Sequence, residues 1–200
     1  MSLKKPLTTV TYSLSKVSEI LSPIRTMRLT RDKEQDRKTM QCLLSEGDLV
    51  VCPEGTTCRE PYLLRFSSLF AELTDEIVPV AFHANMSMFY GTTATGLKCL
   101  HPFLVCMNPK PCYDTKILEK VPNEFTCGGG KFPYEVANYV QRELGNALGF
   151  ESTNITRRDK YMMLAGNEGV ARKKKIKICG DWSFTLKMYK LVLLKEWKKK

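Results

Sequence analysis

The sequence has 200 residues, of which 43% are hydrophobic and 26% are charged, and its formal net charge is +10. This composition is ordinary for a globular protein, and the length favours one domain with a substantial core. No run approaches the roughly 20 apolar residues of a membrane-spanning helix, and the N-terminus lacks the long apolar segment of a signal peptide. The sequence therefore predicts no transmembrane helix in this chain.

The eight cysteines and two histidines form neither a disulfide pattern nor a metal pattern. No two cysteines make a Cys-x-x-Cys pair, and His83 and His101 do not fall at a ligand spacing. We interpret the cysteines as reduced thiols that act mostly as small hydrophobic residues. The sequence therefore predicts no metal site, and no zinc site in particular.

The positive charge is concentrated near the C-terminus. Residues 171–200 contain eleven Lys or Arg and two acidic residues, whereas residues 1–170 contain twenty and nineteen. The folded part is thus nearly neutral and has no recognisable nucleic-acid module. Only salt-sensitive, sequence-independent binding of nucleic acid is expected, and only from the tail. The tail mixes lysines with apolar residues, which is typical either of a helix on a membrane surface or of a disordered segment.

Hydrophobic periodicity predicts an α/β fold with a mostly parallel central sheet flanked by helices. We expect strands at residues 8–12, 24–31, 49–52, 77–82 and 104–107, and helices at residues 13–21, 32–45, 62–73, 133–148 and 161–165. Residues 24–52 make a strand–helix–strand unit, and such crossovers are right-handed and generate parallel sheets. Residues 108–130 are interpreted as an irregular loop, and Pro79 indicates an edge or a bulge in its strand.

A sharp polar turn follows the apolar strand at residues 49–52. Pro53 removes a backbone donor, and Gly55 allows a conformation that other residues resist. We expect the turn to expose its polar side chains at the carboxyl edge of the sheet, where open α/β sheets bind ligands; these side chains are Glu54, Thr56, Thr57, Cys58 and Arg59. Hydroxyls, backbone N–H groups and a guanidinium suit an oxyanion such as phosphate. The alternative is an ordinary polar loop.

This turn and several other segments resemble one known family. The turn Pro53-Glu54-Gly55-Thr56-Thr57-Cys58-Arg59-Glu60-Pro61 resembles the third sequence block of the glycerolipid acyltransferases, and most closely the land-plant glycerol-3-phosphate acyltransferases. Residues 22–32 are similar to the second block and residues 77–80 to the fourth. Three further strings carry the resemblance: Tyr90-Gly91-Thr92-Thr93-Ala94, Gly145-Asn146-Ala147-Leu148-Gly149-Phe150-Glu151 and Thr156-Arg157-Arg158-Asp159-Lys160-Tyr161.

The resemblance implies transfer of a fatty acyl group from acyl-CoA to glycerol 3-phosphate, in cutin- or suberin-type lipid biosynthesis. It implies that the acceptor phosphate is held by Arg31, Arg28, Glu54, Gly55, Thr56, Thr57 and Arg59. An arginine on a strand could alternatively be a solvated salt-bridge partner. An apolar slot for the acyl chain is expected at Val78, Pro79 and Val80, which could also be plain core. No cofactor is expected beyond acyl-CoA as co-substrate.

The family's base is a histidine that an aspartate five residues later holds in the correct tautomer. Here Met88 stands five residues after His83, and Cys106 stands five residues after His101, so the sequence contains no such pair. We therefore interpret the chain as a fragment that lacks the N-terminal part and this block. Activity of the chain alone is expected to be low, since loss of a positioned base costs roughly 10²–10⁴-fold in rate. His83 is either a substitute base or a bystander.

These readings divide the chain into a partial acyltransferase domain at residues 1–170 and a basic tail outside the family pattern at residues 171–200. The resemblance implies association with a membrane, the endoplasmic reticulum with the domain facing the cytosol. A second hypothesis is a non-catalytic protein that binds lipid or a membrane surface through the basic tail, where each cation contributes about 1 kcal/mol near an anionic leaflet.

Overall fold

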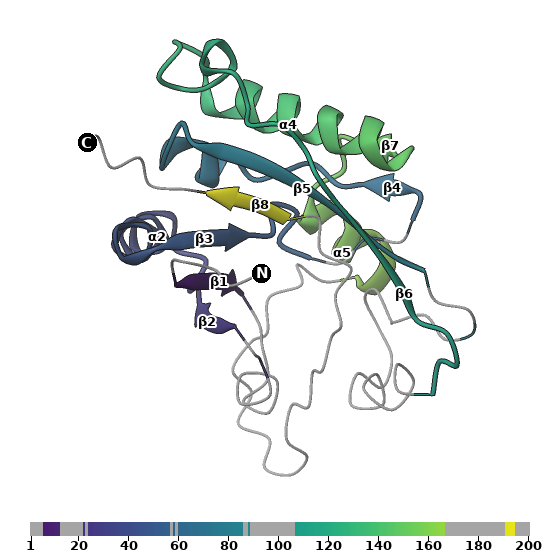
Figure 1. The fold of residues 1–200 in the computed structure, drawn as a ribbon. Helices are drawn as coiled ribbons and strands as arrows, with labels where there is room; N and C mark the ends of the chain where they lie inside the picture. The colour runs from purple at the N-terminus through teal and green to yellow at the C-terminus, as the bar shows by residue number, and fades with distance from the viewer. Residues whose placement is uncertain are drawn as a thin grey trace.

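A computed structural model gives the structure of the chain and describes residues 6–12, 22, 24–56, 58, 60–85, 88, 107–166 and 191–194, the last four as backbone alone. A six-stranded sheet forms its centre, in the order β2-β1-β3-β8-β5-β6 (Figure 1). The strands are β1 (Leu7–Thr11), β2 (Arg25–Arg28), β3 (Asp48–Val51), β5 (Ile77–Asn85), β6 (Cys112–Ile117) and β8 (Leu191–Leu194). The α/β class is confirmed, and the predicted strand 104–107 and helix 13–21 lie largely or wholly outside the described residues.

Parallel pairing is concentrated on one side of the sheet. Strand β1 pairs in parallel with both β2 and β3. Strand β8 is antiparallel to both β3 and β5, so β5 runs in the same direction as β3. Strand β6 then adds an antiparallel edge to β5. The parallel part thus matches the strand–helix–strand prediction, whereas the backbone of residues 191–194 forms a strand, not the membrane-surface helix considered for the tail.

The helix of the strand–helix–strand unit begins and ends where the sequence predicts. Helix α2 (Lys33–Glu46) starts after Asp32, whose carboxylate accepts hydrogen bonds from the backbone N–H groups of residues 34 and 35, as an N-cap does. It ends at Gly47, where a Cβ atom would lie 2.3 Å from the carbonyl oxygen of Pro6. Glycine is therefore required at this position because the incoming chain passes so close to it.

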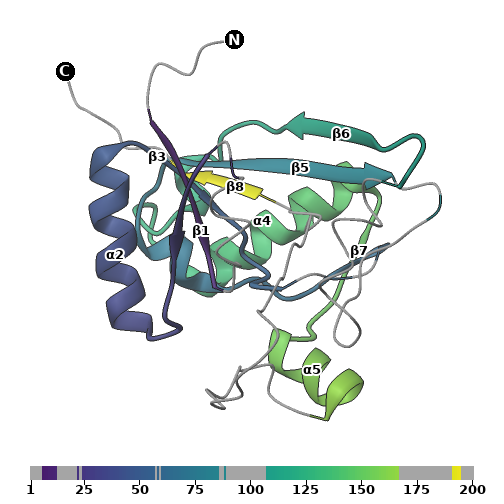
Figure 2. The same cartoon turned by 90° about the horizontal axis from the view of Figure 1, so that it is seen from below.

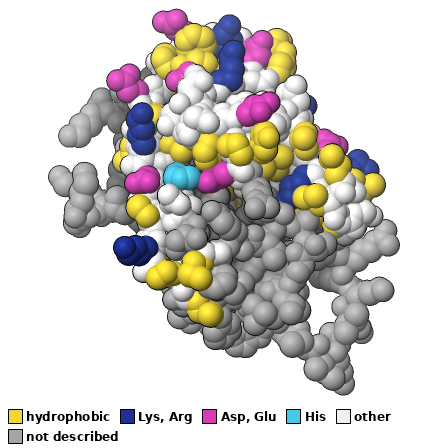
Figure 3. Space-filling model, turned by 90° about the vertical axis from the view of Figure 1, so that its right-hand side faces the viewer, with side chains coloured by type: hydrophobic (Ala, Val, Ile, Leu, Met, Phe, Trp, Pro, Cys, Tyr) yellow, Lys and Arg dark blue, Asp and Glu magenta, His cyan; other side chains and the backbone are white. Residues whose placement is uncertain are grey.

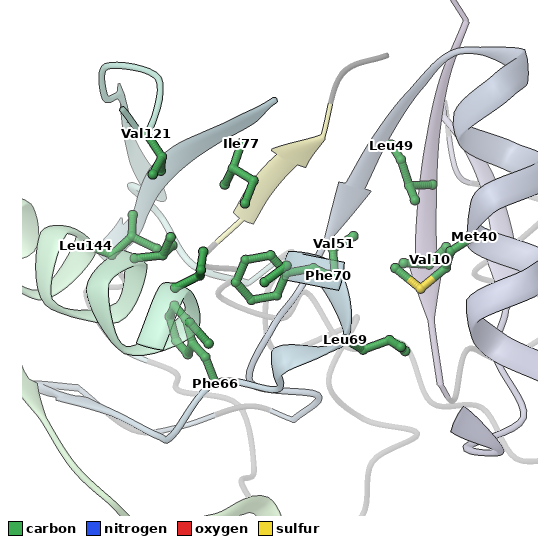
Figure 4. Close-up of a cluster of buried hydrophobic side chains, with 14 of the residues drawn as sticks. Val10, Met40, Leu49, Val51, Phe66, Leu69, Phe70, Ile77, Val121 and Leu144 are labelled. Atoms are coloured by element: carbon green, nitrogen blue, oxygen red, sulfur yellow. The ribbon is translucent and has the colours of Figure 1, made fainter. Parts of the chain in front are cut away.

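One continuous hydrophobic core joins the sheet to two helices. Helix α2 packs beside β3, whereas α4 (Pro133–Leu148) packs along β5 and the 3₁₀ helix η1 (Ser68–Glu72) (Figure 2). Figure 4 shows Met40 at the α2 end of this core, Leu144 at the α4 end, and Phe70 between them. All three are at most 1% exposed. Full burial of such side chains contributes roughly 1.5–3 kcal/mol each.

Two predictions of local structure are wrong. Residues 62–73 do not form one helix: β4 (Tyr62–Leu63) pairs with β7 (Glu151–Ser152), and η1 follows after a gap. Residues 108–130 are not wholly irregular, since they contain β6 and the 3₁₀ helix η3 (Asn123–Phe125). Every side chain of β6 is exposed, so the strand has no apolar alternation by which the sequence could reveal it.

None of the helices in the described residues is both long enough and apolar enough to cross a bilayer.

Candidate functional site

The parallel strands bring three separate segments to one edge of the sheet. Since β1, β2 and β3 point the same way, the residues that follow them leave the sheet together. Tyr12 follows β1, Arg31 lies three residues after β2, and the turn at Pro53–Thr56 follows β3. This is the carboxyl edge, where open α/β sheets bind ligands.

Arg31 is held in an unusual conformation at this edge. Its φ is 74°, the one positive φ of a non-glycine residue among those described, which costs about 1–2 kcal/mol. The buried carboxylate of Asp36 restrains the segment: it accepts hydrogen bonds from the backbone N–H of Thr30 at 2.7 Å and of Arg31 at 2.9 Å, and from the Thr30 hydroxyl at 2.9 Å. The backbone that carries the Arg31 side chain is therefore fixed in advance.

The guanidinium of Arg31 lies against an aromatic ring and near a second arginine. Its Cζ atom is 5.1 Å from the centroid of the Tyr12 ring, a cation–π distance. Desolvation by these neighbours lowers the pKa of Arg31 from its ordinary value, and the positive charge of Arg157 lowers it further. The Tyr12 hydroxyl has a raised pKa, because burial and the charge of Asp36 outweigh the effect of the two arginines.

Gly55 occupies the left-handed region that the sequence predicts for the turn. Its φ is 62°, and its N–H donates to the carbonyl of Cys52 at 3.1 Å. A Cβ atom here would lie 3.7 Å from the Tyr12 ring and 3.9 Å from Cδ of Arg157, which are ordinary contacts. Glycine is thus favoured here by its backbone conformation and not by lack of space. The same tyrosine ring touches both Arg31 and the turn.

The expected exposure of Glu54 is wrong. This residue is 6% exposed, and its carboxylate accepts a hydrogen bond from the backbone N–H of Leu64 at 3.0 Å. A buried N–H needs such a partner because leaving it unsatisfied costs about 1–3 kcal/mol. Glu54 therefore anchors the returning chain and shapes the turn from inside.

Thr56 connects the turn to helix α5 (Arg157–Ala165). Its hydroxyl accepts a hydrogen bond from Nζ of Lys160 at 3.0 Å and donates to the hydroxyl of Tyr161 at 3.3 Å. The ammonium of Lys160 is also 4.7 Å from the centroid of the Tyr161 ring. Helix α5 thus lies directly over the turn.

The predicted capping box fixes the start of α5. Thr156 accepts from the N–H of Asp159, whose carboxylate accepts from the N–H and the hydroxyl of Thr156. These hydrogen bonds lower the pKa of Asp159 from its ordinary value. The helix begins four residues earlier than the sequence predicts, directly after this cap, and that earlier start includes Arg157 and Lys160 in the helix.

Other predicted site residues lie apart or outside the described structure. Arg28 ends β2 with its side chain exposed. Thr57 and Arg59 fall outside the described residues, as do most of residues 86–90.

The predicted acyl slot is divided by the strand's own geometry. Along β5, Ile77, Pro79 and Ala81 are buried while Val78 and Val80 are partly exposed, because successive side chains of a strand face opposite sides. Val78 and Val80 therefore share one face, and Pro79 lies on the other with the core. The edge expected at Pro79 is wrong, because β5 pairs with β8 on one side and with β6 on the other.

His83 forms a separate pair with Glu60. Its Nδ1 is 3.0 Å from Oε1 of Glu60, and its ring contacts that of Phe150 edge to face at 5.8 Å between centroids. Figure 3 shows the one histidine of the described residues, in cyan, with acidic side chains on both sides. A carboxylate at Nδ1 fixes the ring's orientation. His83 is therefore a packed, partnered side chain, and the bystander reading fits its surroundings.

Sequence reasoning missed four residues of the edge: Tyr12, Arg157, Lys160 and Tyr161. The last three share one helix face, since positions three and four apart are neighbours on a helix. A signal was present, because residues 156–161 are one of the strings that resemble the acyltransferases. Only the folded path of the chain shows that this face meets Gly55 and Thr56.

An α/β sheet with cations gathered around a glycine turn at its carboxyl edge agrees with the resemblance to glycerolipid acyltransferases. The sequence comparisons make that class specific, because the relatives they find are plant glycerol-3-phosphate acyltransferases, to which this chain is homologous over most of its length. The chain is 67% identical to glycerol-3-phosphate acyltransferase 1 of Arabidopsis thaliana over 171 residues, and 57% identical to glycerol-3-phosphate acyltransferase RAM2 of Petunia hybrida over 173 residues.

A probable glycerol-3-phosphate acyltransferase 2 of Arabidopsis thaliana is 60% identical over 177 residues. Each of these alignments covers 86% of this chain, but only 29%, 33% and 36% of the relatives numbered 1, 2 and RAM2 respectively. The chain thus spans about a third of the length of the curated relatives it matches. No family model matches the chain, and no solved structure matches it.

Proposed function

We propose that this chain contributes the acceptor-binding part of an enzyme that transfers a fatty acyl group from acyl-CoA to glycerol 3-phosphate. One observation carries the proposal: Arg31 and the Gly55 turn lie on the same tyrosine ring at the carboxyl edge of the parallel strands. The relatives' names, glycerol-3-phosphate acyltransferase, supply the reaction.

Arg31 is suited to bind the acceptor phosphate because its backbone is restrained by Asp36 before any ligand arrives. A guanidinium binds phosphate through strong, charge-assisted hydrogen bonds. In this proposal the hydroxyl of Thr56 is a further ligand, the buried Glu54 holds the turn in shape, and Arg28 assists from the end of β2. Thr57 and Arg59 complete the set by resemblance.

For the acyl chain we propose the face of β5 that carries Val78 and Val80, which is partly exposed; Pro79 supports it from the core side. An acyl thioester is already activated, so the enzyme chiefly needs a base for the alcohol and correct positioning of both substrates. The 200 residues contain no His-x-x-x-x-Asp pair, and we therefore propose that the chain alone turns over little substrate.

By resemblance, we propose that the product enters cutin- or suberin-type lipid and that the protein works at the cytosolic surface of the endoplasmic reticulum. These finer assignments rest on the family and not on any distance in the structure.

The test measures binding of glycerol 3-phosphate to the full chain by calorimetry. We expect Arg31→Ala to weaken binding at least tenfold, since hydrogen bonds to charged groups contribute about 1.5–3 kcal/mol. Arg25→Ala is the matched control: this arginine begins β2, at the far end of the strand, where it pairs with Glu46 at 2.6 Å on the surface. Equal binding by the Arg31→Ala chain and the unmodified chain would refute the proposed site.

A second measurement addresses the reaction itself. Radiolabelled glycerol 3-phosphate and acyl-CoA are supplied to a longer protein in which a His-x-x-x-x-Asp block precedes this chain in frame. Acyl transfer that Arg31→Ala abolishes and Arg25→Ala leaves intact is the expected result. A folded but inactive longer protein would contradict the assignment.

A further inference from the structure

Helix α5 places two more cations against the turn that carries Thr56. Nζ of Lys160 donates to the Thr56 hydroxyl at 3.0 Å. Cδ of Arg157 is 3.9 Å from the position that a Cβ atom of Gly55 would take. Figure 2 shows α5 apart from α2 and α4, so these contacts come from the helix's approach to the sheet edge and not from packing in the core.

These cations meet Arg31 from the opposite side. Arg31 and Tyr12 both interact electrostatically with Arg157, and Arg31 interacts with Tyr161 as well. Tyr161 in turn lies beneath both α5 cations, 5.9 Å from Cζ of Arg157 and 4.7 Å from Nζ of Lys160. Three positive groups from two distant parts of the chain therefore surround Gly55 and Thr56.

The acidic groups closest to this cluster serve the backbone. The carboxylate of Asp36 holds the N–H groups of residues 30 and 31, and that of Asp159 holds the N–H and the hydroxyl of Thr156. Like charges at such short range repel each other, and an ammonium that is 6% exposed, as Lys160 is, carries a desolvation cost. A multiply charged anion between the three cations would offset both.

We infer that Arg157 and Lys160 are phosphate-binding residues of the acceptor site, and that together with Arg31 they select a phosphate monoester over a neutral alcohol. This inference rests on the proposed function. A phosphate presents several acceptor oxygens, so it can take a planar guanidinium on one side and a compact ammonium on another. A neutral acceptor such as glycerol would leave three cations uncompensated.

The test titrates the full chain with glycerol 3-phosphate and, in parallel, with glycerol and with inorganic phosphate. We expect Arg157→Gln and Lys160→Met each to weaken binding of glycerol 3-phosphate at least tenfold. Arg158→Gln is the matched control, because this neighbour on α5 is exposed to solvent, and we expect less than a twofold effect. Glycerol should bind at least a hundredfold more weakly than glycerol 3-phosphate to the unmodified chain.

A second measurement needs no variant and covers the case in which Lys160→Met does not fold. In the unmodified chain, the side-chain Nε–H resonance of Arg157 should shift during titration with inorganic phosphate, whereas that of Arg158 should not. Equal shifts for the two arginines would overturn the inference.

The two proposals fail in different ways. If Arg31→Ala abolishes binding while the Arg157→Gln and Lys160→Met chains bind as the unmodified chain does, the role of α5 is refuted and the proposed function stands. If the unmodified chain binds neither glycerol 3-phosphate nor inorganic phosphate, both proposals are overturned.

Discussion

Substitution of Asp36 by alanine should destabilise the chain far more than an ordinary helix substitution. The carboxylate is 2% exposed and accepts three hydrogen bonds, each of which contributes about 1.5–3 kcal/mol with a charged acceptor. Thr30 and Arg31 are exposed, so water can replace part of what is lost. We therefore expect a loss of about 3 kcal/mol in the free energy of unfolding.

That loss is a large part of the roughly 5–15 kcal/mol by which domains are stable. It should lower the melting temperature by roughly 6–12 °C for a chain of this size. Urea unfolding followed by circular dichroism gives the free energy directly. The control is Asp32→Ala, which removes the exposed N-cap of the same helix and should cost about 1 kcal/mol. If Asp36→Ala costs no more than Asp32→Ala, Asp36 does not restrain the Arg31 segment as we describe.

Two further predictions concern glycine and cysteine. Gly47→Ala should cost more than 2 kcal/mol, because its methyl group would lie 2.3 Å from a backbone oxygen, whereas Gly55→Ala should cost only about 1–2 kcal/mol, the cost of its positive φ; urea unfolding that reverses this order would contradict the contacts. At pH 8, iodoacetamide should modify Cys127 more slowly than the exposed Cys112, because burial, aided by Asp75 and Glu72, raises the pKa of Cys127 and so lowers its thiolate fraction. Peptide mass spectrometry measures both rates, and equal rates would count against a buried thiol.

The parts of the fold that sequence predicts well are those with local signals. Helix α2 has an N-cap, a buried stripe and a glycine at its end, and α4 has an apolar stripe ending at Gly149. Strand β4 was mistaken for helix because its apolar residues fit either period. Its true state depends on Gln141 of α4, whose side-chain amide donates to the carbonyls of Leu64 and Thr153 at 3.0 Å, and such distant partners leave no local pattern.

The site shows the same division. Arg31 and the Gly55 turn were predicted from their own neighbourhoods. The burial of Glu54 depends on an N–H ten residues away, and the approach of Lys160 to Thr56 joins residues 104 apart in sequence. Contacts of that range follow from the packing of the whole chain, which explains why α5 was recognised as a helix but not as part of the site.

Strand β8 has a consequence for the order in which the protein can be completed. It alone joins the β2-β1-β3 half of the sheet, which carries the acceptor site, to the β5-β6 half. Its residues, 191–194, leave the ribosome almost last. During synthesis the two halves can form early, but they remain without their connecting strand until translation of this chain is nearly finished.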